Sequence, residues 1–233
     1  MMNKRGVSHI EIVISVVLFL AFVGLALFFF SPGDTDRLVD TTLIYAFDEV
    51  ISRASEDIES YSVILECSSG CEDVVGISIT GVDPLLKVSA VNGEGVNLPA
   101  ERTSVDLVSV QRDGNTFFSI MFGENFLINS GGSGADLPVY TLGASDSKKI
   151  ISKEKIEELV VEYNTNYLSL KKDEFNLPDR IDFEFELDVF GLNIKPTERE
   201  KFSGGEVFGK TERVEVINEN GETSFGDLTI RVW

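Results

Sequence analysis

The chain is poor in the side chains that most enzymes use for proton transfer and covalent catalysis. It has one histidine among 233 residues, two cysteines and one tryptophan. The histidine, His9, precedes the longest apolar run, so residues 31–233 lack the commonest general base. They also contain no glycine–serine elbow and no phosphate-binding loop. The sequence therefore predicts no catalytic residues, no enzyme activity and no cofactor, and an enzyme is the least favoured interpretation.

Basic residues are scarce as well. The chain has 20 Lys+Arg against 39 Asp+Glu, a net charge of −19. Residues 1–30 hold only Lys4, Arg5 and Glu11 among these, which leaves 18 basic and 38 acidic residues beyond them and a net charge of −20. A surface with this charge repels phosphate groups. The sequence thus excludes nucleic acid and anionic lipid as partners of this part of the chain.

The acidic residues are dispersed, and they do not form a metal-binding motif. Asp182, Glu184 and Glu186 alternate along a predicted strand, so their carboxylates share one face and could bind calcium. No calcium-loop spacing accompanies them. Solvated charges at a sheet edge are the favoured interpretation, and no metal site is predicted.

The two cysteines, Cys67 and Cys71, are separated by three residues. A zinc site would need further ligands, and the only histidine is remote in sequence. A redox-active pair would be expected as Cys-x-x-Cys. In an exported domain this spacing favours a small structural disulfide loop.

One apolar run stands out, from Ile12 to Phe30. It is interrupted only by Ser15 and Gly24. Nineteen helical residues extend about 28 Å, close to the roughly 30 Å of a bilayer core. A secretory signal peptide would have a shorter apolar region and a small-residue cleavage site, so a transmembrane helix is favoured. The basic N-terminal flank predicts a single-pass protein of the cell membrane, with a cytoplasmic N-terminus and an extracellular C-terminal part.

The residues before this run form a recognisable pattern. Lys4 and Arg5 are followed by Gly6, and Glu11 comes five residues after the glycine. This start resembles the class III (prepilin-type) signal peptide of archaeal type IV pilin-like proteins. In that family a prepilin-type peptidase cuts after the glycine and leaves the apolar segment on the mature protein. The resemblance implies cleavage between Gly6 and Val7.

The resemblance also implies a role for Glu11, which would become the fifth residue of the mature chain. Many family members carry glutamate there, and its carboxylate is thought to pair with the new terminal amine of a neighbouring subunit. An anion in apolar surroundings needs such a cation. The chain is thus expected to be a membrane-anchored surface subunit of a type IV pilus-like filament or adhesion structure. Other pilin-like subunits, the peptidase and the membrane would be its partners.

Two departures from the family pattern keep a second interpretation open. Val7 stands where bacterial pilins usually have phenylalanine, and Pro32-Gly33 interrupt a helix that pilins commonly continue. The alternative is a single-pass membrane-anchored extracellular protein that does not assemble. In that case Glu11 would be solvated at the level of the lipid headgroups.

The rest of the pattern predicts an α+β fold. An amphipathic stalk helix is expected over 34–61, because apolar residues recur there at spacings of three and four. An antiparallel β-rich extracellular head with one further helix, from Ser152 to about Lys172, would fill residues 62–233. The full division is a cleaved leader at 1–6, a transmembrane and assembly helix at 7–31, the stalk helix and the head, with a candidate lobe boundary near 130–150.

Period-two alternation predicts eight strands in the head. They are Val63–Glu66, Val74–Thr80, Leu85–Val91, Val105–Arg112, Thr116–Phe122, Arg180–Val189, Glu212–Asn218 and Asp227–Trp233. Asp113-Gly114-Asn115 and Asn220-Gly221 predict hairpin turns between the fourth and fifth strands and between the last two.

The leader pattern generates the first prediction. Native protein should begin at Val7, because the peptidase that reads Lys4-Arg5-Gly6 cuts after the glycine. Intact-mass spectrometry of material from the host tests this. A native chain that begins at Met1, at Met2 or near Ser31 would contradict the assignment.

The cysteine spacing generates the second prediction. Cys67 and Cys71 should be joined in folded native protein, so alkylation without a reductant should label neither thiol. The same alkylation after reduction is the control and should label both. Labelling of both thiols before reduction would show that the loop is not closed.

Overall fold

The computed structural model describes residues 9–29, 33–66, 70, 72–128, 137–199 and 206–233. Side chains are described for residues 12–25 and, within those ranges, from residue 40 onward. The chain divides into two compact units, residues 1–42 and residues 43–233.

The first unit contains the helix α1, His9–Phe29. All but one of its large described apolar side chains are exposed: Phe22 is 72% exposed, Leu18 65% and Val13 60%, while Val23 is half-buried. Among the described residues, no helix is both long enough and apolar enough to cross a membrane.

This finding corrects two predictions. The transmembrane helix predicted over 7–31 is wrong, and with it the predicted location as a single-pass protein of the cell membrane with a cytoplasmic N-terminus and an extracellular head. The sequence estimate counted the whole apolar run Ile12–Phe30 as one span, whereas no helix among the described residues meets the requirements of length and apolarity together.

The second helix, α2, runs from Gly33 to Ala54 and ends seven residues earlier than predicted. Its buried side includes Phe47 and Val50, at helical spacing. The predicted continuation fails because residues 55–61 belong to a strand that is paired on both of its edges. Ile58 fits the helical period, but it also fits a strand, and its pairing with Lys148 of a neighbouring strand decides between them.

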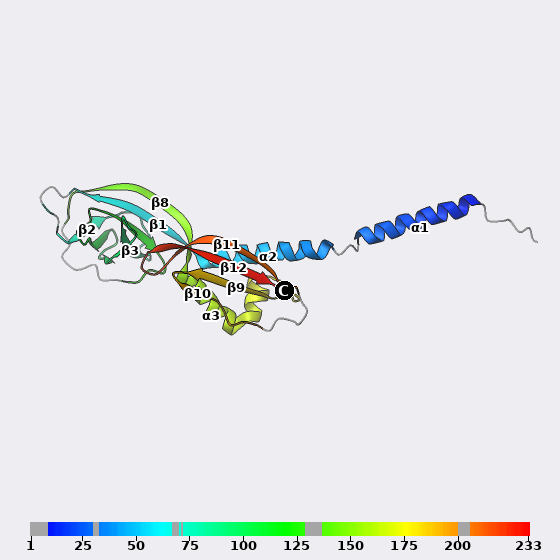
Figure 1. Ribbon diagram of the computed structural model, residues 1–233. Coiled ribbons are helices and arrows are strands. Elements are labelled where there is room, and N and C mark those ends of the chain that lie inside the picture. The colour runs from blue at the N-terminus through cyan, green and yellow to red at the C-terminus, as the bar shows by residue number, and fades with distance from the viewer. Residues whose placement is uncertain (1–8, 30–32, 67–69, 71, 129–136, 200–205) are drawn as a thin grey trace, which may run out of the picture. The chain divides into compact units, whose positions relative to one another are not determined.

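A large mixed sheet dominates the second unit (Figure 1). Its nine strands follow the order β10-β9-β12-β11-β8-β1-β7-β3-β4, and a smaller sheet has the order β2-β6-β5. The strands are β1 Ser55–Leu65, β2 Val74–Ser78, β3 Lys87–Asn92, β4 Asn97–Leu98, β5 Ala100–Arg102, β6 Leu107–Gln111, β7 Phe117–Gly123, β8 Tyr140–Ser152, β9 Phe183–Val189, β10 Leu192–Ile194, β11 Phe208–Ile217 and β12 Thr223–Val232.

The predicted antiparallel head is therefore corrected to a mixed one. All described strand pairs are antiparallel except β8 with β11, which run parallel and pair only at Ile151 with Val216 and at Ser152 with Ile217. Each half of the large sheet is otherwise built from antiparallel neighbours. The two halves thus meet at a short parallel junction, which periodicity within single strands cannot reveal.

The first half of the large sheet packs on the small sheet. β1, β3 and β7 contribute Val63, Ala90 and Ile120 to a continuous core, and the small sheet contributes Val75 and Val110. The turn at Asp113-Gly114 has the positive φ angles expected of a hairpin turn, 46° and 78°. It nevertheless joins β6 in one sheet to β7 in the other, so the hairpin predicted there is wrong.

The second half of the large sheet is covered by helices. α3, Lys153–Ser169, continues as the π-helical turn η1, Leu170–Glu174, and lies where the sequence predicted a helix. Tyr163 of α3 packs its ring against Phe183 and Phe185 of β9. Arg53 of α2 forms ion pairs with Glu162 of α3 and with Glu174 of η1. α2 and α3 are therefore joined to each other beside the sheet.

Candidate functional site

The candidate site lies at the outer edge of β9. The neighbouring strand β10 pairs only with residues Leu187–Val189. It turns back through Phe190-Gly191, which have positive φ angles of 54° and 71°, as a two-residue hairpin of type I′ requires. The first part of β9, from Phe183 to Glu186, therefore has no strand partner on this side among the described residues.

The backbone N–H and C=O groups of successive strand residues point to alternate sides, and this alternation shows which of them face the open edge. Asp182 and Trp233 exchange two backbone hydrogen bonds, of 2.9 and 3.0 Å. In an antiparallel pair the next residue points its N–H and C=O the other way. The backbone groups of Phe183 and Phe185 therefore point away from β12, towards the open edge.

Two tyrosines of α3 cap the first of these positions. The Tyr163 hydroxyl donates to the Phe183 carbonyl at 2.6 Å. The Tyr167 hydroxyl accepts from the Phe183 N–H at 3.3 Å and donates to the Asp182 carboxylate at 2.7 Å. Both rings are almost fully buried, and this burial is the main cause that raises the pKa of each phenol well above its ordinary value. The hydroxyls thus stay protonated, as the two donated hydrogen bonds require.

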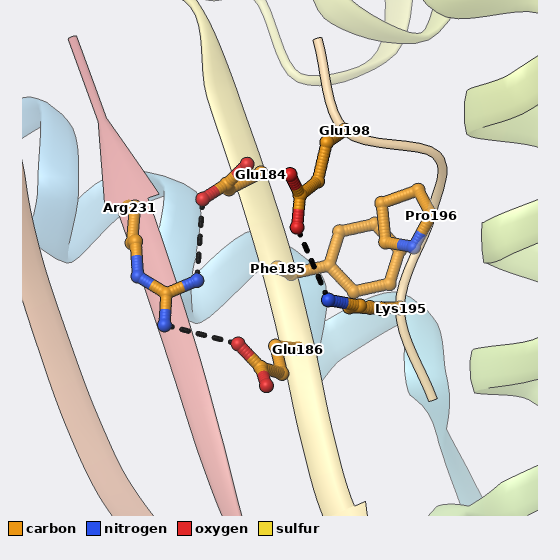
Figure 2. A pocket seen from close by; sticks show the side chains of 7 residues that line it. All are labelled: Glu184, Phe185, Glu186, Lys195, Pro196, Glu198 and Arg231. Carbon is orange, nitrogen blue, oxygen red and sulfur yellow. Dashed lines mark hydrogen bonds and ion pairs between the residues drawn. The ribbon is translucent and has the colours of Figure 1, made fainter. Parts of the chain in front are cut away.

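The next open position, Phe185, borders a cavity of about 320 Å³ (Figure 2). The chain that follows β10 passes along its other side. A strand residue opposite Phe185 would have to donate an N–H, and the chain there carries Pro196, which has none. Strand pairing therefore ends at Ile194. The cavity is lined by Glu184, Phe185, Glu186, Lys195, Pro196, Glu198 and Arg231.

The charged side chains of this cavity are paired with one another. Arg231 of β12 contacts Glu184 at 3.2 Å and Glu186 at 2.9 Å. Lys195 contacts Glu198 at 3.2 Å, as Figure 2 also shows. A hydrogen bond of 2.6 Å from Asn193 and the contact with Arg231 hold the pKa of Glu186 below its ordinary value. Glu186 therefore stays ionised at neutral pH.

A second charged cluster lies behind the tyrosines. Lys171 is only 3% exposed, and its ammonium group donates to the Asp182 carboxylate and to the Asp179 carbonyl, both at 2.9 Å. Burial by itself would raise the pKa of Asp182, but hydrogen bonds from Lys171 and Tyr167 outweigh it and lower the pKa. The Arg199 guanidinium lies 3.5 Å above the Tyr167 ring.

The structure thus places the three carboxylates that were considered for calcium. Asp182 binds Lys171, and Glu184 and Glu186 bind Arg231. In the part of the chain that the structure describes, no group of three His, Cys, Asp or Glu residues could hold a metal ion. The three acids are therefore not free solvated charges, because Lys171 and Arg231 form ion pairs with them.

The residues singled out from the sequence motif lie elsewhere. Lys4, Arg5, Gly6, Val7, Cys67 and Cys71 are outside the described residues. Glu11 belongs to α1, and its side chain is not among those described. The roles predicted for all of these residues stay predictions.

Sequence reasoning missed Lys171, Arg231 and the capping function of the tyrosines. Tyr163 and Tyr167 lie on the buried face of α3, where an apolar helix period is expected to place aromatic residues. One feature of the sequence could have indicated Lys171. It follows Tyr163 and Tyr167 at a spacing of four residues, which places the lysine on the same, otherwise apolar, face of the helix. A cation on such a face needs a buried anion, but the sequence does not say which of the many acids supplies it.

The chain was compared with family models, with curated proteins and with solved structures, and nothing matched. The chemistry of the site therefore rests on its geometry alone. Its charges are neutralised within the chain, and its first edge position is capped by side chains. This arrangement closes the edge of β9 and stabilises it, and it offers no described nucleophile.

The buried pair generates a prediction about two neighbouring lysines. Lys171→Met should destabilise the protein by about 3 kcal/mol, at the lower end for a broken buried pair because Asp182 remains partly exposed. Lys172→Met is the matched control. Lys172 also has an aspartate partner, Asp179, at 2.7 Å, but both groups are solvent-exposed, so little change is expected. Urea unfolding monitored by circular dichroism measures both.

The same pair predicts a pH dependence. The pKa of Asp182 is lower in the folded state, so its stabilising contribution is complete above about pH 4, the ordinary value for aspartate. It is lost as the pH falls through the lower folded-state pKa. The stability difference between wild type and Lys171→Met should therefore shrink below about pH 4. The assignment would be contradicted if this difference in unfolding free energy were independent of pH, or if both lysine variants lost the same amount of unfolding free energy.

Proposed function

We propose that this chain is a pilin-like structural subunit. A prepilin-type peptidase releases it from its basic leader, and its helix α1 then associates with the α1 helices of other copies. The acidic second unit is left available for contacts such as adhesion. No enzymatic role is part of this proposal.

The exposed apolar surface of α1 carries the proposal. Ten of the eleven large apolar residues from Ile12 to Leu25 are exposed by 51–72%, and the eleventh, Val23, is half-buried. A helix that is apolar on every side is stable only when it is covered. The second unit of the chain has a core of its own, so its fold does not depend on α1.

The energies are sufficient for assembly. Full burial of one such side chain contributes about 1.5–3 kcal/mol, so covering the exposed half of ten contributes on the order of 10 kcal/mol. Association costs about 4–15 kcal/mol in lost freedom of motion. Packing against more than one neighbouring helix therefore offsets the cost, which favours a multimeric assembly over a simple dimer.

The motif before α1 supports the same proposal. Glu11 lies within α1, and a carboxylate in a packed bundle of apolar helices needs a cation. Cleavage after Gly6 would create a terminal ammonium at Val7, and the Val7 amine of another copy is the cation that the resemblance suggests. Glu11 then fixes the register between subunits, while apolar burial supplies most of the affinity.

Two leucines of nearly equal exposure test this assembly. Leu18 in α1 is 65% exposed and Leu168 in α3 is 67% exposed. Leu18→Asp should shift cleaved full-length protein from large species to monomer, because a buried unpaired carboxylate is costly. Leu168→Asp should leave the size distribution unchanged. Sedimentation velocity and electron microscopy of native material measure the outcome.

Glu11→Gln separates the contribution of the proposed Glu11–amine contact from that of apolar packing between α1 helices. It removes the charge and keeps the shape, so it should reduce ordered assemblies less severely than Leu18→Asp. Wild-type protein that begins at Val7 and stays monomeric would end the proposal. The same is true if both leucine variants assemble like the wild type.

A further inference from the structure

β8 has an open edge that the fold does not use. On one side it pairs with β1 along nearly its whole length, from Ile151 opposite Ser55 to Tyr140 opposite Leu65. On the other side it meets β11 only at Ile151 and Ser152. Residues 141–149 are exposed, and among the described residues they have no strand partner on this side (Figure 1).

Other edges of the protein are capped by tyrosine hydroxyls. Tyr163 and Tyr167 cap Phe183 of β9, and the Tyr140 hydroxyl accepts from the Ser78 N–H at 2.9 Å and donates to its carbonyl at 3.2 Å on β2. Within the described chain, no tyrosine hydroxyl reaches the backbone of residues 141–149. Unpaired backbone of this length is a template for another strand.

The sequence of the edge is complementary to itself. Asp146, Ser147 and Lys148 follow one another. If two copies of this strand run antiparallel with Ser147 opposite Ser147, Asp146 of each copy lies opposite Lys148 of the other. Of the two-fold registers centred on a residue of this strand, this is the one that places opposite charges face to face. Centring on Lys148 or on Asp146 would place like charges opposite each other.

We propose that the open edge of β8 is a contact between two copies of this chain, which pair antiparallel about Ser147. The paired strands run from Ser145 to Lys149, with Lys149 of one copy opposite Ser145 of the other. The pairing extends the sheet of one copy into that of the next, and it is separate from the contact through α1.

The charges of β8 favour this edge over the open edge of β11. β11 carries a similar sequence, in which Lys210 and Glu212 flank Thr211, but these two side chains already contact each other at 2.7 Å. On β8, Asp146 has no ion-pair partner among the described residues. Lys148 contacts Glu215 at 2.7 Å and remains 43% exposed, so its ammonium group can contact a second carboxylate.

Disulfide trapping in the full-length chain tests the register. Ser147→Cys should form a disulfide-linked dimer under mild oxidation, because residues opposite each other have Cα atoms about 4.5–5.5 Å apart, within disulfide range. Ser145→Cys is the matched control, since its two copies would lie about 13 Å apart. Both variants retain Cys67 and Cys71. Denaturing gels dissociate assemblies that are held only by α1, so the dimers that remain are disulfide-linked. Mass spectrometry should identify the peptide pair that is cross-linked through position 147 of both copies.

Charge variants in the Ser147→Cys background test the complementarity. Asp146→Lys and Lys148→Asp should each reduce the dimer about tenfold, because each places like charges opposite each other twice. A mixture of the two should form a mixed dimer, in which lysines of one copy again face aspartates of the other. Equal trapping at positions 145 and 147, no trapping at 147, or no recovery in the mixture would overturn the proposal. If the charges on this edge only prevent strand pairing, no trapping at position 147 is expected.

Discussion

The unpaired backbone at the edges of the large sheet is the constraint on which the rest of the second unit depends. At β9, the constraint is met by two hydroxyls that must both reach Phe183. α3 supplies them from one face, and it leaves regular helical angles at Asn166, between the two tyrosines, before it continues as a π-helical turn. This irregular end brings Lys171 to Asp182. The capping of one strand edge thus accounts for the shape of the helix and for its buried cation.

The excess of acidic residues imposes a second constraint. A net charge of −19 disfavours the compact state, so the few cations have most effect where one of them neutralises several carboxylates. Arg231 contacts both Glu184 and Glu186, and Arg53 contacts both Glu162 and Glu174. Arginine suits this position because its planar guanidinium can donate in two directions at once. The polar lining of the cavity at the edge of β9 is therefore explained by the ion pairs that neutralise this face of the sheet.

Local pattern predicted much of the strand content, since β2, β7 and β9 end within two residues of their expected ends, and Asn220-Gly221 does join the antiparallel pair β11 and β12. It failed where long-range pairing decides. β8 was missed because its residues 141–149 are exposed and mostly polar, so it has no alternating apolar face. The ion pair between Arg231 and Glu184 joins residues 47 apart in the chain, and no local period encodes such a distance. The motif from Lys4 to Gly6 lies outside the described residues, so its role as a peptidase site stays a prediction.

The two proposed contacts between copies have different physical characters, and each compensates for a weakness of the other. Apolar packing of α1 is strong but has little register specificity, because apolar side chains tolerate sliding and rotation. Pairing along five residues of β8 is weak, since each opposed charge pair contributes only about 0.2–1 kcal/mol, but a shift by one residue abolishes its complementarity. Once α1 holds two copies together, pairing at β8 becomes intramolecular, which raises its effective concentration when the intervening chain can span the two sites. The weak β8 edge can then act with the Glu11 contact to select the arrangement of subunits, which apolar burial alone would leave undetermined.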